Sequence, residues 1–247
     1  MEKPLRKQPD KKSSTEKRED TPQERELKIV VPRAAIEPLI ASAPAATIDQ
    51  WYFPKDVELF QRVARECALD LPSDADVSQA RIRKQVEPNG KVVYTATFKG
   101  QKDLTTFSRS EFEVVISQET AERLLPQATN GHLQKRRHFI EGIVVIDGQP
   151  EKQKAEIDLL LQDAKGDASD YPIAFFEIEC DSDAAIDAIR KGRVTFSEEI
   201  NAVLRAGKEA SDNKLLSMTT IAKKGVDRDG AADLLKKITP ESKKKKK

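Results

Sequence analysis

Runs in which polar and apolar residues alternate recur through the middle of the chain and predict β-strands. The first, Glu24–Val31, alternates charged and apolar side chains until Pro32 ends the pattern, as expected of a half-buried strand. Further runs follow: Thr47–Phe53, Gln79–Val86, Lys91–Gly100, Thr105–Ser117, His132–Ile146, Lys154–Gln162 and Tyr171–Cys180. The turn sequences Pro88-Asn89-Gly90 and Asp147-Gly148 separate neighbouring runs, and such short turns join antiparallel strands.

Shorter stretches with helical spacing lie between the strands and after them. They are Ala34–Ala41, Lys55–Leu69, Gln118–Leu125, a helix that begins at Asp181 or Ser182 and runs through Arg190, and Ser197–Ala206. From there to about Ile238 the pattern is weakly helical and does not predict where this segment lies relative to the strands. Strands in mostly antiparallel order with few helices predict an α+β fold: an eight-stranded antiparallel closed β-barrel (tunnel) with flanking helices.

Composition divides the chain of 247 residues into a patterned middle and charged ends. Hydrophobic residues make up 38% and charged residues 34%, against about 45–50% and about 25% in ordinary soluble proteins. Residues 1–22 carry charge with almost no apolar side chain, so we predict a disordered tail there. Residues 23–206 form the predicted tunnel domain. Residues 207–247 form a C-terminal helical extension that ends in the lysine run Lys243–Lys247.

Net charge and cysteine content narrow the function classes. The formal net charge is +1, which favours neither nucleic acid nor acidic partners for the whole molecule. Cys67 and Cys180 lie among apolar neighbours and form no disulfide framework, as in proteins of a reducing compartment. No apolar stretch approaches the about 18 residues of a membrane span. We therefore expect a soluble cytoplasmic protein, either a monomer or a homodimer, without a membrane partner.

Much of the remaining charge lies within the predicted strands, on one face of each. Residues two apart on a strand point to the same side. The basic positions are Lys28, Arg81, Arg83, Lys99, Arg109, Lys135 and Arg137. The acidic positions are Glu24, Glu26, Glu111, Glu113, Glu156, Asp158, Glu177 and Glu179. On any single strand such a face is usually one that points into water.

Two features of the whole set favour an enclosed face instead. The charges are segregated by sign from strand to strand, and a closed barrel can enclose its charged face while helices cover its apolar face. A bore with so many charges is costly unless each finds a partner. Two ligands together would account for the basic and the acidic side chains of the bore. A highly negative ligand would bind the basic side, and hard cations such as Mg²⁺ or Mn²⁺ would bind the carboxylates.

The order of these charged positions resembles the CYTH, or triphosphate tunnel metalloenzyme, superfamily. The matching motifs are the E-x-E-x-K strand Glu24-Arg25-Glu26-Leu27-Lys28, Arg81-Ile82-Arg83, Lys99, Arg109-Ser110-Glu111-Phe112-Glu113, Lys135-Arg136-Arg137, Asp158 and Glu177-Ile178-Glu179. The resemblance implies an eight-stranded tunnel that depends on Mg²⁺ or Mn²⁺. Members of the superfamily include inorganic, thiamine and RNA 5′-triphosphatases and class IV adenylyl cyclases.

The resemblance also implies roles for single residues. Triphosphate would be bound by Lys28, Arg81, Arg83, Lys99, Arg109, Lys135 and Arg137. Metal would be bound by Glu24, Glu26, Glu111, Glu113, Asp158, Glu177 and Glu179, although Glu111 and Glu113 could instead orient the arginines. The implied catalytic set is Glu24, Glu26, Lys28, Arg81, Arg83, Lys99, Arg109 and Arg137. A basic residue after the last strand, Arg190, Lys191 or Arg193, would close the tunnel. The chain departs from the family in a longer insertion between Trp51 and Arg81.

The function that these features predict is hydrolysis of the terminal phosphate of inorganic triphosphate or of a nucleoside or organic triphosphate. Its partner would be a triphosphate-containing small molecule, and nucleic acid enters only as an RNA 5′ end. The alternatives are a class IV-type adenylyl cyclase and a non-catalytic polyphosphate- or nucleotide-binding module. No Ser/His/Asp or Cys/His nucleophile is needed for the hydrolase, and we expect His132 and His138 to be surface residues.

Overall fold

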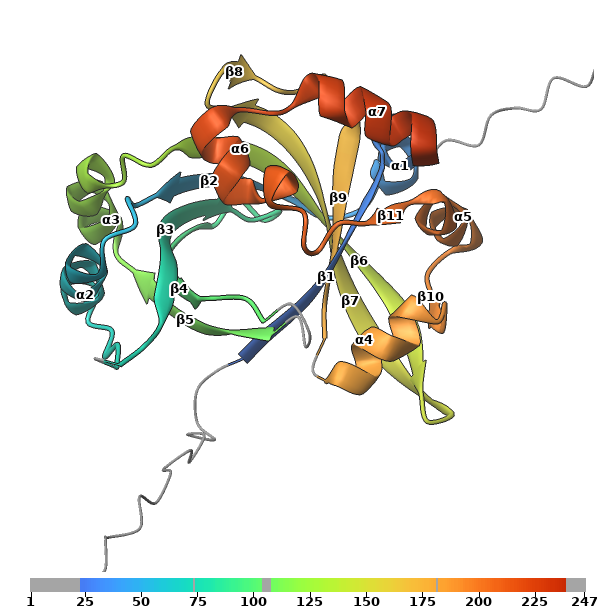
Figure 1. Cartoon of the computed structure of the whole chain (residues 1–247), viewed down its shortest axis with the longest axis horizontal. Coiled ribbons are helices and arrows are strands. Elements are labelled where there is room, and N and C mark those ends of the chain that lie inside the picture. Colours follow the sequence, from blue (N-terminus) through green and yellow to red (C-terminus); the bar gives the residue numbers. More distant parts are fainter. Residues whose placement is uncertain (1–22, 73, 104–107, 181, 239–247) are drawn as a thin grey trace, which may run out of the picture.

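Eight strands close into an antiparallel barrel in the computed structural model, which describes residues 23–72, 74–103, 108–180 and 182–238 (Figure 1). They are β1 (Gln23–Pro32), β2 (Ala45–Tyr52), β3 (Val77–Val86), β4 (Val92–Gly100), β5 (Ser108–Ile116), β6 (His132–Ile146), β7 (Gln149–Asp163) and β9 (Ile173–Glu179). The order around the barrel is β6-β2-β3-β4-β5-β1-β9-β7, and β7 pairs with β6 to close it. The predicted α+β barrel is confirmed. The charged tail 1–22 and the lysine run lie outside the described residues.

The β6–β7 hairpin shows why the turn sequences predicted strand pairing. Asp147 and Gly148 both have positive φ, 50° and 80°. This is the primed turn whose twist matches that of two antiparallel strands, and Asp-Gly is a favoured sequence for it. The two strands pair from Ile146↔Gln149 down to Gln134↔Gln162. This local turn therefore sets the pairing of the two strands that close the barrel.

Helices cover the apolar outer face of the barrel on two sides. On the β3–β4 side lie α2 (Val57–Glu66) and α3 (Gln118–Leu124), followed by the short 3₁₀ turn η1 (Leu125–Gln127). Phe60 and Leu124 there pack in one cluster with Ile82 and Phe98. On the β7–β9 side lie α1 (Arg33–Ile40), α4 (Asp183–Arg190) and α5 (Glu198–Ala206), which share a second cluster with the outer face of those strands. Burial of this outer face leaves the charged face of each strand pointing into the barrel.

The C-terminal part of the chain closes one end of the barrel. It contains β11 (Lys208–Glu209), the 3₁₀ turn η2 (Lys214–Leu216), α6 (Met218–Lys224) and α7 (Arg228–Ile238), and Figure 1 shows α6 and α7 lying across the barrel. Side chains at the ends of the inner rows, among them Val30, Leu160 and Phe175, form an apolar plug with Met218 and Ile221. Two further short strands, β8 (Gly166–Asp167) and β10 (Val194–Thr195), pair with β7 and β6.

β1 explains how this segment reaches the barrel interior. The first three residues of β1 pair with β5, whereas from Glu26 onward β1 pairs with β9 along its opposite edge and no longer with β5. β11 pairs with the edge that β5 leaves, opposite Ile29 and Val30. The Ala210 amide then donates to the Lys28 carbonyl at 2.9 Å, and the Lys28 amide donates to Ser211 Oγ at 2.9 Å. The C-terminal segment thus completes the wall of the barrel beside β1.

Two expectations about outer residues are corrected by the structure. His138 is 7% exposed and lies on β6 opposite Ala45, so it is buried and not a surface residue. His132 is half-buried, stacks on Trp51, and its Nε2 lies 3.3 Å from Asp49 Oδ1.

The start of α4 follows Ser182, which caps the helix by accepting a hydrogen bond from the Ala185 amide at 3.2 Å. None of the described helices is long and apolar enough to cross a membrane.

Candidate functional site

The inner faces of the strands enclose a cavity of about 640 Å³. Its lining includes every predicted site residue except one: Glu24, Glu26, Lys28, Arg81, Arg83, Lys99, Arg109, Glu111, Glu113, Lys135, Arg137, Glu177 and Glu179. The exception is Asp158, which lies behind the lining and is fully buried. The alternation of charge along each strand therefore predicted which side chains share this enclosed face. Their individual roles stay predictions.

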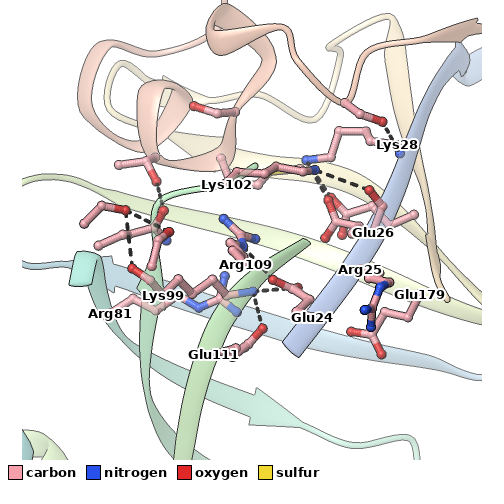
Figure 2. A pocket seen from close by; sticks show the side chains of 18 of the residues that line it. Glu24, Arg25, Glu26, Lys28, Arg81, Lys99, Lys102, Arg109, Glu111 and Glu179 are labelled. Atoms are coloured by element: carbon pink, nitrogen blue, oxygen red, sulfur yellow. Dashed lines mark hydrogen bonds and ion pairs between the residues drawn. The ribbon is translucent and has the colours of Figure 1, made fainter. Parts of the chain in front are cut away.

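A first group of ion pairs surrounds Glu24 near the start of β1. Its carboxylate accepts from Lys99 Nζ at 2.7 Å and from Arg109 Nε at 2.6 Å, and Lys99 Nζ also lies 2.8 Å from Glu111 (Figure 2). Burial opposes the charged form of Glu24, but Lys99 and Arg109 lower its pKa well below the usual range. Glu24 and Glu111 thus hold two cations in place around the cavity.

A second group of ion pairs is centred on Arg137 of β6. Arg137 Nη2 donates to Glu177 at 2.8 Å, and Glu177 also binds Lys28 Nζ at 2.8 Å. Arg137 Nε and Nη2 donate to the two oxygens of Asp158, each at 2.8 Å. Lys135 Nζ donates to Asp158 as well. Asp158 lies behind the cavity lining with none of its surface exposed, whereas Glu24, whose oxygens are also engaged, lines the cavity. The surroundings of Asp158 therefore favour a positioning role over the predicted metal ligation.

Burial and neighbouring charges shift the pKa values of Lys135, Lys28 and Glu156 in this group. Burial and the adjacent Arg137 lower the pKa of Lys135 to about 8, although Asp158 opposes the shift. Burial also works against the charge on Lys28, yet Glu177 and Glu26 raise its pKa. Glu156, which pairs with Arg137, has its pKa raised by burial to about 7. An anion that enters the cavity beside Lys135 would favour the charged form of this lysine.

Arg81 and Arg83 of β3 differ from the other cations because no carboxylate oxygen of a described residue lies closer to them than 4.0 Å, although Glu111 and Glu24 raise the pKa of Arg81 against the effect of burial. Arg81 forms no ion pair with a described residue, and the nearest carboxylate oxygen to Arg83 is that of Glu113 at 4.0 Å. The Nε atoms of both are buried without a hydrogen-bond partner in the described part of the chain. Burial, together with Arg81 and Arg137, lowers the pKa of Arg83 to about 10. Two adjacent arginines left in this state favour binding of a phosphate-type anion, which accepts paired N–H bonds.

Carboxylates gather on the other side of the cavity, at the start of β1 and the end of β9. Glu26 and Glu179 are direct cross-strand partners, and like charges in that position repel. Glu179 is exposed to solvent, yet partial desolvation raises its pKa, and Glu24 and Glu26 raise it further. A hard divalent cation with oxygen ligands would relieve this repulsion, so the donor set fits Mg²⁺ or Mn²⁺.

The fit to a metal is one of charge and donor chemistry. Within residues 23–72, 74–103, 108–180 and 182–238, no three His, Cys, Asp or Glu side chains already form a metal-sized group. Glu113, another predicted ligand, is 39% exposed and accepts a hydrogen bond from Thr97 Oγ1 at 2.7 Å. Glu24, Glu26 and Glu179 are therefore the residues that we expect to hold a cation, after side-chain rotation.

The basic residues expected to close the tunnel lie elsewhere. Arg190 pairs with Glu209 at 2.5 Å, and Lys191 pairs with Asp187 at 2.6 Å on the exposed side of α4. Arg193 follows α4 and, like the other two, does not line the cavity. That expectation was wrong because α4 packs on the outer face of the barrel, where its buried residues join the β7–β9 cluster.

The cavity wall is completed instead by Ala210–Thr219, which the sequence pattern did not place. Ser211, Asn213, Lys214 and Thr219 are among its lining residues, and Thr219 Oγ1 donates to Gln79 at 2.9 Å. Lys102 also lines the cavity, with Nζ 3.3 Å from the Glu26 carbonyl. The segment carries no charge alternation and only weak helical periodicity, so no local signal connected it with the site.

Comparisons with solved structures find proteins that are similar to this chain at low sequence identity and low TM-score. The chain is similar to the inorganic triphosphatase NE1496, at 20% identity and a TM-score of 0.38 over 83% of this chain and 97% of that one. It is also similar to a candidate adenylyl cyclase from Hippeastrum with a dominant triphosphatase activity, at 11% identity and a TM-score of 0.46 over 83% and 97%. A protein from Pyrococcus horikoshii gives 17% identity and a TM-score of 0.38 over 68% and 84%. No protein-family model matches the sequence, and no curated protein sequence matches it.

Proposed function

We propose that this protein is a divalent-metal-dependent triphosphatase that removes the terminal phosphate of a triphosphate. The observation that carries the proposal is the division of one enclosed cavity into two sides. Arg81 and Arg83 line it with no carboxylate oxygen of a described residue closer than 4.0 Å, while Glu26 and Glu179 line it as a repelling cross-strand pair. A polyphosphate chelated to a metal ion is a ligand that neutralises both sides together.

The side chains of the cavity would act chiefly by positioning and electrostatic stabilisation. Arg81 and Arg83 would bind the phosphoryl oxygens, and Lys28 and Arg137, fixed by Glu177, would stabilise negative charge that develops during transfer. Glu24, Glu26 and Glu179 would hold Mg²⁺ or Mn²⁺. Such an ion, when bound, lowers the pKa of a coordinated water so that it can act as the nucleophile. A covalent intermediate is not required.

A phosphate-release screen tests this function. Purified protein is incubated with inorganic triphosphate, ATP or thiamine triphosphate, each with Mg²⁺, with Mn²⁺ and with EDTA. We expect orthophosphate with at least one substrate, dependent on the metal and abolished by EDTA. Cyclic AMP from ATP would identify a cyclase instead. Binding of these compounds without any turnover under all metal conditions would identify a non-catalytic module and refute the proposal.

A further inference from the structure

The inner face of β2, β3 and β4 contains uncharged polar side chains whose hydrogen-bonding groups are buried. Tyr52 lines the cavity, and Gln50 and Thr95 are cross-strand partners of Arg83, which also lines it. The Gln50 amide nitrogen and oxygen and the Thr95 hydroxyl are buried, and none makes a hydrogen bond with a described residue. The buried Tyr52 hydroxyl makes no hydrogen bond of normal geometry either, although it lies close enough to Arg81 for the two groups to interact electrostatically. The Nε atoms of Arg81 and Arg83 are in the same state. In the described part of the chain, His138 and Tyr171 are the other residues with such an atom.

Strand register places these side chains side by side on the inner face. Gln50 of β2 is the cross-strand partner of Arg83, and Arg83 is in turn the partner of Thr95 on β4. In the next inner row, Tyr52 is the partner of Arg81. Directly paired residues have their Cβ atoms about 5 Å apart. The unused groups therefore form one continuous patch, which we call the β2–β3–β4 wall.

The concentration of unused groups in this wall is unusual for a folded protein. Buried polar groups are nearly always hydrogen-bonded, because an unmade bond costs the desolvation free energy of the group. Across the cavity the cations are paired with carboxylates, as Arg137 is with Asp158 and Glu177. On β4 itself, Thr97 donates to Glu113 at 2.7 Å, whereas Thr95, two residues away on the same face, has no partner in the described chain.

We propose that Gln50, Tyr52 and Thr95 act with Arg81 and Arg83 as a binding subsite for a terminal phosphoryl group of the triphosphate. This inference rests on the proposed function. A terminal phosphoryl group offers three strong acceptor oxygens, more than an internal phosphoryl group in the same chain. The amide N–H₂ and the two hydroxyls supply donors beside the guanidinium groups that such a ligand would contact.

Neutral donors also avoid additional repulsion between positive charges in this wall. The pKa of Arg83 is lowered to about 10 by burial, by Arg81 and by Arg137, so a further cation here would increase the repulsion. A hydroxyl or an amide adds a hydrogen bond to the anion without adding positive charge to the unliganded protein. The wall can therefore gain affinity for phosphate while remaining foldable when empty.

The test removes single donors and measures binding and stability separately. The variants are Tyr52→Phe, Thr95→Val and Gln50→Met, and the probe is inorganic triphosphate, titrated calorimetrically in EDTA and again with Mg²⁺. Each variant should bind triphosphate about 10-fold or more weakly, as expected for one lost hydrogen bond to a charged group. Melting temperatures of the free Thr95→Val and Gln50→Met variants should be unchanged or higher, because each substitution removes a group that has no hydrogen-bond partner in the described part of the free protein. Tyr52→Phe should change the melting temperature little, since the hydroxyl that it removes interacts with Arg81 without a hydrogen bond of normal geometry.

Two control variants separate a ligand role from a structural one. Tyr171→Phe deletes a hydroxyl that is equally buried and unused, but Tyr171 lies in the apolar plug and not on the wall. It should leave triphosphate affinity unchanged. Thr97→Val deletes a hydroxyl that already has a partner, and it should lower the melting temperature where Thr95→Val does not.

The outcomes distinguish this inference from the function on which it rests. If the wild type binds triphosphate and the wall variants bind it equally well, the subsite is refuted while the triphosphatase stands. A fall in melting temperature for Tyr52→Phe and Thr95→Val alike would show that their hydroxyls serve the free protein, which also refutes it. A wild type that neither binds nor hydrolyses triphosphate would overturn the proposed function as well.

Discussion

Asp158 and Glu179 provide the sharpest test of the site, because the resemblance gave both the same role and the structure gives them opposite surroundings. Asp158 is 0% exposed and accepts hydrogen bonds from both Lys135 and Arg137. Glu179 lies opposite Glu26, and Glu24 and Glu26 raise its pKa in addition to partial desolvation. We therefore expect Asp158→Asn to affect stability and Glu179→Gln to affect metal binding.

The size of the first effect follows from burial. Replacing Asp158 by Asn keeps the shape but removes the negative charge that compensates Lys135 and Arg137. Breaking a fully buried ion pair by changing one partner costs about 3–5 kcal/mol. For a chain of this size each kcal/mol shifts the melting temperature by about 2–4 °C, so Asp158→Asn should melt about 6–20 °C below the wild type.

Glu179→Gln should behave in the opposite way. It removes one of two carboxylates that repel each other, so the free energy of unfolding should be unchanged or higher. Turnover should fall by at least about 100-fold, and the Mn²⁺ concentration needed for half-maximal activity should rise, because the cation loses one charged ligand.

Urea unfolding in EDTA and phosphate release across a Mn²⁺ titration measure the two effects independently. The reasoning is refuted if Asp158→Asn is as stable as the wild type, or if Glu179→Gln loses as much stability as Asp158→Asn. Equal loss of Mn²⁺ affinity in both variants, with neither destabilised, would restore Asp158 as a metal ligand. Asp187→Asn is a suitable control, since this carboxylate pairs with Lys191 on the exposed side of α4 and should change neither quantity.

The remaining predictions concern Arg81, the loss of stability at acid pH and the packing of α6. Arg81→Ala should abolish triphosphate hydrolysis without lowering the free energy of unfolding, because Arg81 forms no ion pair with a described residue; wild-type turnover in this variant would contradict the site. The pKa of Glu177 is lowered well below its usual value of 4.5, by Lys28, Lys135 and Arg137 acting against burial. A lowered carboxylate pKa stabilises the folded state above the unfolded pKa and loses that contribution as pH falls. The wild type should therefore lose more stability than Glu177→Gln between pH 7 and pH 3 in urea unfolding, and parallel pH profiles would refute the assignment. Gly131 has a φ of +117°, and a Cβ there would lie 2.2 Å from the Ala222 carbonyl. Gly131→Ala should displace α6 and lower the melting temperature, whereas Gly90→Ala, which meets no atom within 4 Å, should cost only the strain of its turn; equal melting temperatures would show that α6 does not pack as described.

The charged inner face was predictable because it is a local property. Side chains alternate across a strand whatever its neighbours are, so Glu24, Glu26 and Lys28 had to share one face of β1. Turn chemistry is equally local, as Asp147 and Gly148 show. The helices that cover the barrel were also identified, because Phe60 and Val63 repeat at helical spacing and are buried as expected.

The surroundings of each charge were not local and could not be predicted in this way. Arg137 and Glu177 are 40 residues apart in the sequence and meet at 2.8 Å only because β6, β7 and β9 pair in one register. The same register buries Asp158 completely. The pairing of β11 with β1 beside Lys28 is possible because β5 no longer pairs with that edge of β1. The pattern of residues 207–238 alone does not indicate that this edge is open.

The sequence by itself determined which residues form strands, which of their side chains share a face, and that this face is charged. Only the tertiary structure decided how the face is enclosed, which carboxylates neutralise which cations, and that no carboxylate oxygen of a described residue lies closer than 4.0 Å to Arg81 or Arg83. The physical reason is that strand alternation acts over two residues, whereas barrel closure and ion pairing depend on contacts between strands far apart in the chain.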